Sequence, residues 1–294
     1  MSPMVTPPCA DRASRMTPGT GATPVPPPPD ASTVVATLRT AGCVYAEEEA
    51  QLLIAAAATP TELARMVAKR VAGVPLEHVI GWAEFCGLRI AVDPGVFVPR
   101  HRTELLVHEA VSRAQPAAVV VDLCCGSGAM GAAIAVAVGR IDLHASDIDP
   151  AAVRCARRNL SAVGGHVHEG DLYAALPDRL LGRVDVLVAN VPYVPTAEIE
   201  LLPREARLHE PGAALDGGAD GLDVLRRVSA EATRWLAPGG HLLVETSDLQ
   251  APVAVDILAA DGLIPEVAHD DDLEATVVIG RRPGWSSESA EGTC

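Results

Sequence analysis

A polar tetrapeptide, Asn190-Val191-Pro192-Tyr193, directly follows the apolar run at 184–189, which is typical of a buried strand. Pro192 and Pro195 exclude a helix and a regular sheet ladder here, because proline lacks a backbone N–H and fixes its own φ. In open α/β sheets, ligands bind just outside the carboxyl ends of the strands. The pattern therefore predicts a rigid loop of catalytic residues, Asn190, Val191, Pro192 and Tyr193, with a plain strand exit as the alternative.

A glycine-rich loop is expected between a strand at 117–125 and a helix at 128–138. Gly126, Gly128 and Gly131 have the spacing G-x-G-x-x-G, which lets the backbone approach a nucleotide-like ligand at a helix N-terminus. The residues expected to contact this ligand are Cys124, Cys125, Gly126, Ser127 and Gly128. We interpret the two cysteines as small residues at a tight turn, and a vicinal disulfide or a catalytic thiol is the alternative.

Asp147 ends the next expected strand, about twenty residues after the glycine loop, where an acidic side chain can bind the hydroxyl groups of a ribose. A cap of the following helix is the alternative role for this residue. The glycine spacing and Asp147 suit both NAD and S-adenosylmethionine, so they do not identify the cofactor.

Three further residues favour S-adenosylmethionine over NAD. Asp122 ends the strand before the glycines, where it would attract a cationic methionine group and repel an anionic pyrophosphate. Asp171 is placed to accept from an adenine amino group, with Leu172 against the ring. Asn190 contributes to the cofactor site as well and has no evident use in hydride transfer. Purely structural roles, such as a turn cap at Asp171, are the alternatives.

The order of these features resembles that of methyltransferases acting on planar nitrogens, whose tetrapeptide is usually Asn-Pro-Pro-Tyr. An amide or exocyclic amine nitrogen is methylated when acceptors hold its hydrogens, so that the lone pair turns toward the methyl group. The resemblance implies that the Asn190 side-chain oxygen and the Val191 carbonyl are these acceptors. It also implies that Tyr193 packs against the planar group. Val191 stands where the family has proline, which keeps the carbonyl but loses a rigid ring.

A second, longer resemblance covers residues 75–107, which are similar to the linker of the release factor glutamine methyltransferases. Segments 209–228 and 241–250 resemble the same family, and the similarity runs from about Pro75 to Arg282. The matching linker positions are Pro75, Ile80, Gly81, Phe85, Gly87, Val92, Val96, Pro99, Arg100, Thr103 and Glu104.

This family resemblance implies an α/β fold, in which a small helical domain precedes a Rossmann-like class I methyltransferase domain. That domain would have seven strands, the last of them antiparallel. The implied reaction is methylation of the glutamine side-chain nitrogen in the Gly-Gly-Gln motif of peptide-chain release factors, and Phe97 would line the methyl pocket. Cys124 replaces the first glycine of the usual motif, and His101-Arg102 replaces a common Pro-acidic pair, which indicates a divergent branch.

Two other functions remain open at this point. A nucleic-acid amino methyltransferase is one, since adenine presents the same kind of planar nitrogen. The other is a protein that binds S-adenosylmethionine as a partner or sensor without catalysing transfer.

The elements that position these residues divide the chain into five expected parts. These are a disordered Pro-rich tail (1–30), a helical domain (31–81), a hairpin linker (82–102), the methyltransferase domain (103–283) and a disordered tail (284–294). Strands and helices alternate in the fourth part, which predicts a mostly parallel, doubly wound sheet. The linker hairpin is expected to turn at 93–95, and a helix is expected from Gly221 to Gly240.

Composition limits the classes of partner. With 23 Lys and Arg against 38 Asp and Glu, the net charge is −15, which argues against direct nucleic-acid binding. Seven scattered cysteines without zinc spacing indicate a reduced, cytoplasmic protein. We expect no membrane segment and no metal. His166 and His168 share one face of a strand, which we interpret as a solvated edge.

Overall fold

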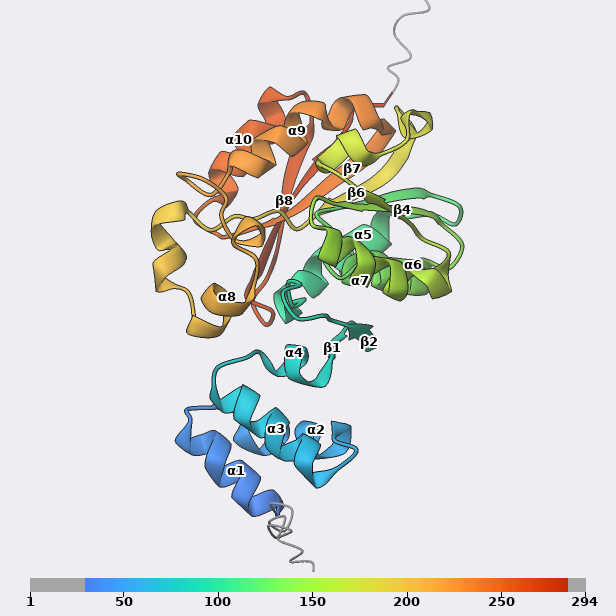
Figure 1. The fold of residues 1–294 in the computed structure, drawn as a ribbon. Helices are drawn as coiled ribbons and strands as arrows, with labels where there is room; N and C mark the ends of the chain where they lie inside the picture. The colour runs from blue at the N-terminus through green and yellow to red at the C-terminus, as the bar shows by residue number, and fades with distance from the viewer. Residues whose placement is uncertain (1–29, 285–294) are drawn as a thin grey trace, which may run out of the picture.

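The computed structural model of the protein describes residues 30–284 (Figure 1). Residues 1–29 and 285–294, which belong to the two predicted tails, lie outside the described residues. Figure 1 shows a group of N-terminal helices next to a larger α/β unit, with a short hairpin between them.

Three helices begin the described chain: α1 (Ala31–Thr40), α2 (Ala46–Ala56) and α3 (Pro60–Val71). Asp30 caps α1, because its carboxylate accepts from the Thr33 N–H at 2.7 Å, and the Thr59 hydroxyl caps α3 in the same way. The helices pack around an apolar cluster of their own, which includes Leu38 and Leu53. The predicted N-terminal helices are therefore confirmed.

A short helix, α4 (Leu76–Ile80), precedes the linker, which contains β1 (Trp82–Phe85) and β2 (Leu88–Ala91). The predicted turn at 93–95 is wrong, because the hairpin reverses at Cys86 and Gly87, where φ is 48° and 70°. A two-residue hairpin turn favours positive φ at both central positions, which Gly87 adopts without strain. Residues 93–95 instead follow the second strand and lead toward Phe97.

Seven strands form one sheet in the order β5-β4-β3-β6-β7-β9-β8. They are β3 (Val119–Leu123), β4 (Asp142–Asp147), β5 (His166–Glu169), β6 (Val184–Ala189), β7 (Leu236–Thr246), β8 (Ile264–Asp270) and β9 (Ala275–Arg281). The first five are parallel, and β9 runs antiparallel to β7 and β8. This confirms the seven-stranded α/β fold with an antiparallel last strand.

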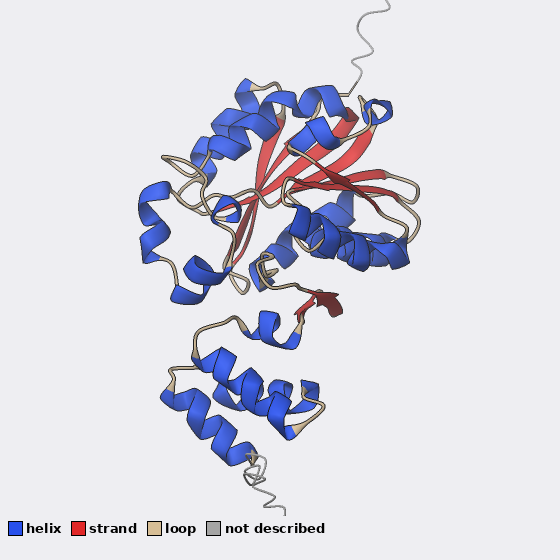
Figure 2. Cartoon of the chain, viewed as in Figure 1, coloured by secondary structure: helices blue, strands red, loops and turns tan. Residues whose placement is uncertain are grey.

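Helices cover both faces of the sheet (Figure 2). One face carries α5 (Glu104–Arg113), α6 (Ala129–Val138) and α7 (Pro150–Leu160), and the other carries α9 (Asp223–Trp235) and α10 (Ala251–Ala260). Alternate residues of β3 enter the two cores: Val120 packs under the first group, whereas Val121 and Leu123 pack under the second. The edge that presents the carboxyl ends of the parallel strands is thereby left open to loops.

The remaining elements are short and lie in the connections. They are α8 (Arg204–His209) and the 3-10 turns η1 (His101–Thr103), η2 (Ser161–Val163), η3 (Leu172–Ala175), η4 (Asp178–Leu180), η5 (Thr196–Leu201) and η6 (Gly212–Ala214). The longest connection, between β6 and α9, contains α8 and two of these turns, and it covers part of the open sheet edge.

Two elements differ from the sequence-based expectation. The helix expected to reach Gly240 ends at Trp235, because Pro238 lacks a backbone N–H and disfavours helical backbone before it, and residues 236–240 begin β7 instead. Strand β8 was not recognised from the sequence. It is an edge strand with mostly exposed or half-exposed residues, and Pro265 at its second position weakens the strand pattern.

The domain boundaries remain a proposal, which the packing supports. The cluster around Leu38 contains buried residues from α1, α2 and α3 only, and the two sheet cores lie within 85–279. We propose 31–81 as the helical domain, 82–102 as the linker and 103–283 as the methyltransferase domain.

Candidate active site

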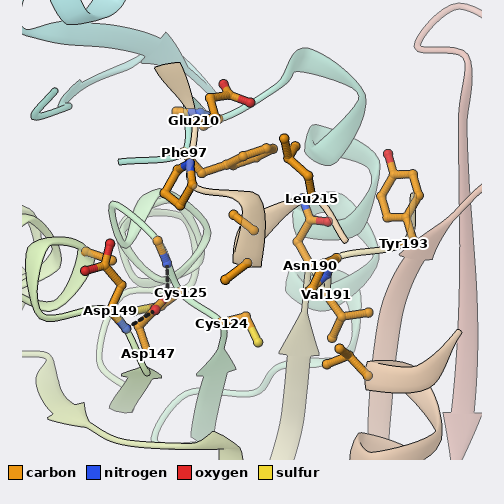
Figure 3. A pocket seen from close by; sticks show the side chains of 18 of the residues that line it. Phe97, Cys124, Cys125, Asp147, Asp149, Asn190, Val191, Tyr193, Glu210 and Leu215 are labelled. Carbon is orange, nitrogen blue, oxygen red and sulfur yellow. Dashed lines mark hydrogen bonds between the residues drawn. The ribbon is translucent and has the colours of Figure 1, made fainter. Parts of the chain in front are cut away.

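A cavity of about 480 Å³ lies at the carboxyl ends of β3, β4 and β6. Its floor consists of the loops that follow these strands, and its roof comes from the linker around Phe97 and from the connection that contains α8. Figure 3 shows Asp147 and Asp149 on one side of this cavity, Tyr193 on the other, and Phe97, Cys124 and Asn190 between them. The size is that of a small-molecule ligand site.

The glycine loop forms one wall of the cavity. Of the five residues predicted to contact the cofactor here, Cys124, Cys125, Gly126 and Ser127 line the cavity, but Gly128 does not. Gly128 caps α6 with φ of 77°, and a Cβ there would lie 3.2 Å from the Cα of Ala156, so its role is to let α6 and α7 pack closely. Burial raises the pKa of both cysteine thiols well above the usual range, which argues against a catalytic thiolate.

Asp147 is held rigidly at the end of β4. Its Oδ2 accepts from the Gly126 N–H at 2.8 Å, and its Oδ1 accepts from the Asp149 N–H at 2.9 Å. The cap of the following helix is Asp149, whose side chain accepts from the Ala151 N–H. Each Asp147 oxygen retains lone-pair capacity toward the cavity, so the carboxylate is pre-oriented for a ligand hydroxyl.

Asp122 does not line the cavity. Its side chain is completely buried on the α6 face of β3, where Oδ2 accepts from the Gly131 N–H at 3.0 Å. Burial raises the pKa of this carboxyl to about 7, with a smaller contribution from Asp147. The sequence predicted that Asp122 contacts the cofactor, but in the structure its side chain is buried beneath the glycine loop and does not reach the cavity.

Asp171 and Leu172 lie at the far end of the cavity wall, after β5. The Asp171 carboxylate accepts from Arg227 Nη2 at 2.6 Å and remains about half exposed. Leu172 is buried with φ of 47°, which directs this side chain into the wall rather than along a regular strand. The pair presents a carboxylate acceptor next to an apolar side chain.

Asn190, directly after β6, is the first of the four predicted catalytic residues, and all four line the cavity. Its Nδ2 lies 3.2 Å from Oγ1 of the buried Thr103 and donates to it. Within residues 30–284, no group donates a hydrogen bond to the Asn190 Oδ1 atom, which is the acceptor of this carboxamide. The arrangement suits the orientation of an N–H group of a substrate.

A second loop holds this catalytic loop from behind. Gly217 and Gly221 approach it very closely. A Cβ added at Gly217 would lie 2.6 Å from the Pro192 carbonyl oxygen, and one added at Gly221 would lie 2.2 Å from the Tyr193 carbonyl oxygen. Gln250 adds a hydrogen bond from Nε2 to the Tyr193 carbonyl at 2.9 Å. The conformation of the four residues is thus fixed by the surrounding backbone rather than by proline rings alone.

Phe97 lines the roof of the cavity, as the family resemblance implied. The guanidinium carbon of Arg100 lies 5.1 Å from its ring centroid, and Arg100 pairs with the buried Glu210 at 2.5 Å. Glu210 also lines the cavity, and burial raises the pKa of its carboxyl. The linker and the α8 connection are therefore joined by an ion pair above the site.

Sequence reasoning missed four further residues of the site: Arg102, Thr103, Glu245 and Gln250. Glu245 lies near the carboxyl end of β7, the strand beside β6, and Tyr193 donates to it at 3.0 Å. The signal that identified Asn190, a polar residue at the carboxyl end of an apolar strand, applies equally to Glu245 and could have found it.

The histidines at the sheet edge form a cluster away from the cavity. His144 is buried and stacks between His166 and His168, at ring-centroid distances of 5.1 and 5.2 Å. Burial lowers the pKa of His144, so its ring stays neutral. Within residues 30–284, no group of three or more His, Cys, Asp or Glu side chains is arranged to hold a metal ion.

A seven-stranded sheet with one antiparallel strand, and a cavity between a glycine loop and an Asn-Val-Pro-Tyr loop, define a class I methyltransferase. Residues 87–216 match the family described as "Methyltransferase small domain". A methyltransferase structure from Pyrococcus furiosus, 18% identical, covers 74% of this chain and 99% of its own with a TM-score of 0.54, and it supports the fold.

Two curated relatives are similar over most of the chain. A release factor glutamine methyltransferase of Geobacter sulfurreducens is 40% identical over 76% of this chain and 80% of its own length. A 4-amino-L-phenylalanine/4-methylamino-L-phenylalanine methyltransferase of Streptomyces pristinaespiralis is 36% identical over 69% of this chain and 71% of its own length. The chain belongs to the release factor glutamine methyltransferase family.

Among the helices within residues 30–284, none combines the length and the apolar character that a membrane crossing requires.

Proposed function

We propose that this enzyme transfers a methyl group from S-adenosylmethionine to the side-chain nitrogen of a glutamine, in the Gly-Gly-Gln motif of a peptide-chain release factor. The observation that carries the proposal is the orientation of Asn190. Its Nδ2 is engaged by Thr103, which leaves Oδ1 as an acceptor in the cavity that also holds the glycine loop.

The residues of the cavity suit a cationic cofactor. Asp147 and Asp149 are exposed to it. Carboxylates at these positions attract a cation and repel a pyrophosphate, which favours S-adenosylmethionine over NAD. Asp147 would hold the ribose hydroxyls, and Asp171 would accept from the adenine amino group beside Leu172.

The chain itself contributes positioning and electrostatics to the reaction. When bound, S-adenosylmethionine supplies a methyl group on a cationic sulfur, so no strong base is required before attack. The Asn190 Oδ1 atom and the Val191 carbonyl would accept the two amide hydrogens of the glutamine. With both hydrogens held, the nitrogen lone pair turns toward the methyl group. The N–C bond would form as the S–C bond breaks, so that the sulfur leaves as a neutral thioether, and the nitrogen would then release one proton to solvent. Preorganised acceptors of this kind lower the barrier without moving during the reaction.

Tyr193 and Phe97 would enclose the planar amide. Both line the cavity, from the catalytic loop and from the linker respectively. A glutamine presented on a protein loop would enter the cavity beneath the linker. The Arg100–Glu210 ion pair would lie above it, in the roof of the cavity. We propose a cytoplasmic location, because release factors act on ribosomes and the scattered cysteines suit a reducing compartment.

A second candidate substrate is a small aromatic amine. The Streptomyces pristinaespiralis relative is named for methylation of 4-amino-L-phenylalanine, whose aniline nitrogen also has a lone pair that is partly delocalised into the neighbouring π system. The same acceptors at Asn190 and Val191 would hold its hydrogens. Direct action on nucleic acid is disfavoured by the net charge of −15.

One experiment separates these functions. The protein is incubated with methyl-labelled S-adenosylmethionine and, in parallel, with release factors, 4-amino-L-phenylalanine or duplex DNA, and the labelled atom is located by mass spectrometry. Label on the glutamine of Gly-Gly-Gln is the expected result. Label on the aromatic amine or on adenine alone would replace the proposal. Cofactor binding without any product would point to a binding protein.

A further inference from the structure

The hydroxyl group of Tyr193 is tied to a buried carboxylate. It donates to Glu245 Oε1 at 3.0 Å, and Arg102 Nε donates to the same oxygen at 3.0 Å. Only 1% of the Glu245 side chain is exposed. The second carboxylate oxygen has no hydrogen-bond partner in the part of the chain that the structure describes. All the hydrogen bonding of this carboxylate is therefore concentrated on one oxygen, between a catalytic-loop residue and a linker residue.

The two donors supply the polar partners that a carboxylate as buried as Glu245 requires. A buried carboxylate without a cation is strongly unfavourable, and removal of one partner of such a pair leaves an uncompensated charge. Arg102 supplies the cation from the linker, with its side chain 45% exposed at the edge of the cavity. Burial and the neighbouring Glu245 raise the pKa of the Tyr193 phenol, so the hydroxyl remains a donor at all physiological pH values.

Tyr193 is held at both of its ends. Its carbonyl accepts from Gln250 Nε2 at 2.9 Å, and the same Nε2 donates to the Asp220 carbonyl at 2.9 Å. The guanidinium carbon of Arg102 lies 6.0 Å from the centroid of the Tyr193 ring. With its backbone and its hydroxyl fixed, the aromatic ring cannot leave the cavity wall without breaking a charge-assisted hydrogen bond.

We propose that Glu245 and Arg102 are positioning residues, which hold the Tyr193 ring in the place where the planar group of the substrate is methylated. The inference rests on the proposed function and deepens it. Neither residue needs to touch the reacting nitrogen: Glu245 acts through the Tyr193 hydroxyl, and Arg102 acts through Glu245. Their loss should therefore lower turnover more than it weakens substrate or cofactor binding.

Single-turnover and steady-state kinetics on a release factor test this role. Tyr193→Phe removes the donor, and Glu245→Gln keeps the shape but removes the charge that strengthens the bond. Each is expected to lower kcat by about tenfold, as for loss of a hydrogen bond to a charged group. The double variant should lose little more than either single variant, since the two substitutions break one shared interaction. KM and cofactor affinity should stay within about threefold, within the scatter of neutral substitutions.

Arg102 gives a graded second readout. Arg102→Met removes the cation at similar length and should lower kcat as Glu245→Gln does, whereas Arg102→Lys should restore part of the loss by restoring the charge. The matched control is Glu109→Gln. Glu109 pairs with Arg113 within α5, at 2.5 Å, and neither residue lines the cavity, so kcat should be unchanged.

The outcomes separate the two hypotheses. Suppose that the wild-type enzyme methylates glutamine, and that the loss of kcat in the double variant equals the product of the losses in Glu245→Gln and Tyr193→Phe. This result would overturn the positioning role but not the proposed function. Normal kcat in Glu245→Gln would do the same. A wild-type protein that methylates no glutamine would overturn the proposed function and this inference with it.

Discussion

The side-chain amide of Asn190 donates to the hydroxyl oxygen of Thr103 at 3.2 Å, across a sequence separation of 87 residues. Thr103 is buried at the end of η1, where the linker enters α5. This contact orients the Asn190 carboxamide and ties the loop after β6 to the start of the methyltransferase domain. Arg102, the preceding residue, reaches the same loop through Glu245.

Removal of the Thr103 hydroxyl should therefore impair turnover. In Thr103→Val the side chain keeps its shape, but Asn190 loses the acceptor that fixes its orientation, and kcat should fall by up to about tenfold, as for one neutral hydrogen bond. Thr103→Ser retains the hydroxyl and serves as the control, with kcat close to that of the wild type. Steady-state kinetics on the glutamine substrate measure both, and equal kcat values in the two variants would contradict the orienting role.

Cofactor affinity should depend on Asp147. Asp147→Ala removes both pre-oriented carboxylate oxygens and should weaken S-adenosylmethionine binding by about 1.5–3 kcal/mol, the usual value for hydrogen bonds to a charged group. Asp142→Ala, at the other end of the same strand, is the control and should bind normally. Titration calorimetry gives both affinities. Binding of NAD by the wild type, with S-adenosylmethionine ignored, would refute the assignment of the cofactor.

Contiguous motifs account for the part of the site that the sequence predicts well. The residues of the glycine loop are contiguous in the chain, and so are Asn190, Val191, Pro192 and Tyr193. Each motif follows a strongly apolar strand, so its place at the sheet edge follows from the alternation of strands and helices. Asp147 is found in the same way. The number of strands and the antiparallel last strand came from a family resemblance, since the polar edge strand β8 has no strong pattern of its own.

Side-chain direction and long-range contacts are what the sequence leaves open. Asp122 was expected to meet the cofactor because it ends a strand beside the glycines, yet it shares the α6 face of β3 with Val120 and is buried there. A period of two along the strand would have indicated this. The contact of Arg102 with Glu245 spans 143 residues, and no local pattern encodes it.

Asp122 should impose a pH dependence on stability. Its pKa is about 7 in the folded protein, above the usual value for an unfolded aspartate, so the folded state binds a proton that the unfolded state releases. The contribution of this residue to the free energy of unfolding should therefore fall as pH rises from about 4 to about 7, and stay constant above that range.

Asp122→Asn removes this titration while keeping an oxygen that can accept from Gly131. Urea unfolding of the cofactor-free protein between pH 4 and pH 8 measures how the free energy of unfolding changes with pH. The part of this change that Asp122 contributes should be absent in the variant. Identical slopes in the two proteins would show that the Asp122 carboxyl titrates in the same range whether the chain is folded or unfolded.

Val191 is the point where the catalytic loop departs from the usual Asn-Pro-Pro-Tyr. Its N–H makes no hydrogen bond within the described residues, so Val191→Pro removes no interaction and restricts Asn190 to the extended backbone that a residue before proline prefers. The variant should raise the free energy of unfolding by about 0.4–1 kcal/mol and retain the wild-type kcat. Thermal unfolding and kinetics test it, and a large loss of turnover would mean that the valine shape itself is required.

Asn190 supplies the sharpest test of the whole site. Asn190→Ala removes the acceptor for the substrate N–H and should lower turnover on the glutamine substrate by about a hundredfold or more, like loss of one preorganised polar group. S-adenosylmethionine affinity should change far less, because Asn190 acts mainly on the transition state. Asn190→Asp keeps an oxygen acceptor but loses the amide donor to Thr103 and adds charge beside Tyr193. Its turnover should therefore lie between that of the wild type and that of the alanine variant. Normal turnover in Asn190→Ala would show that residues 190–193 only connect β6 to the following segment, and the catalytic role of this loop would have to be abandoned.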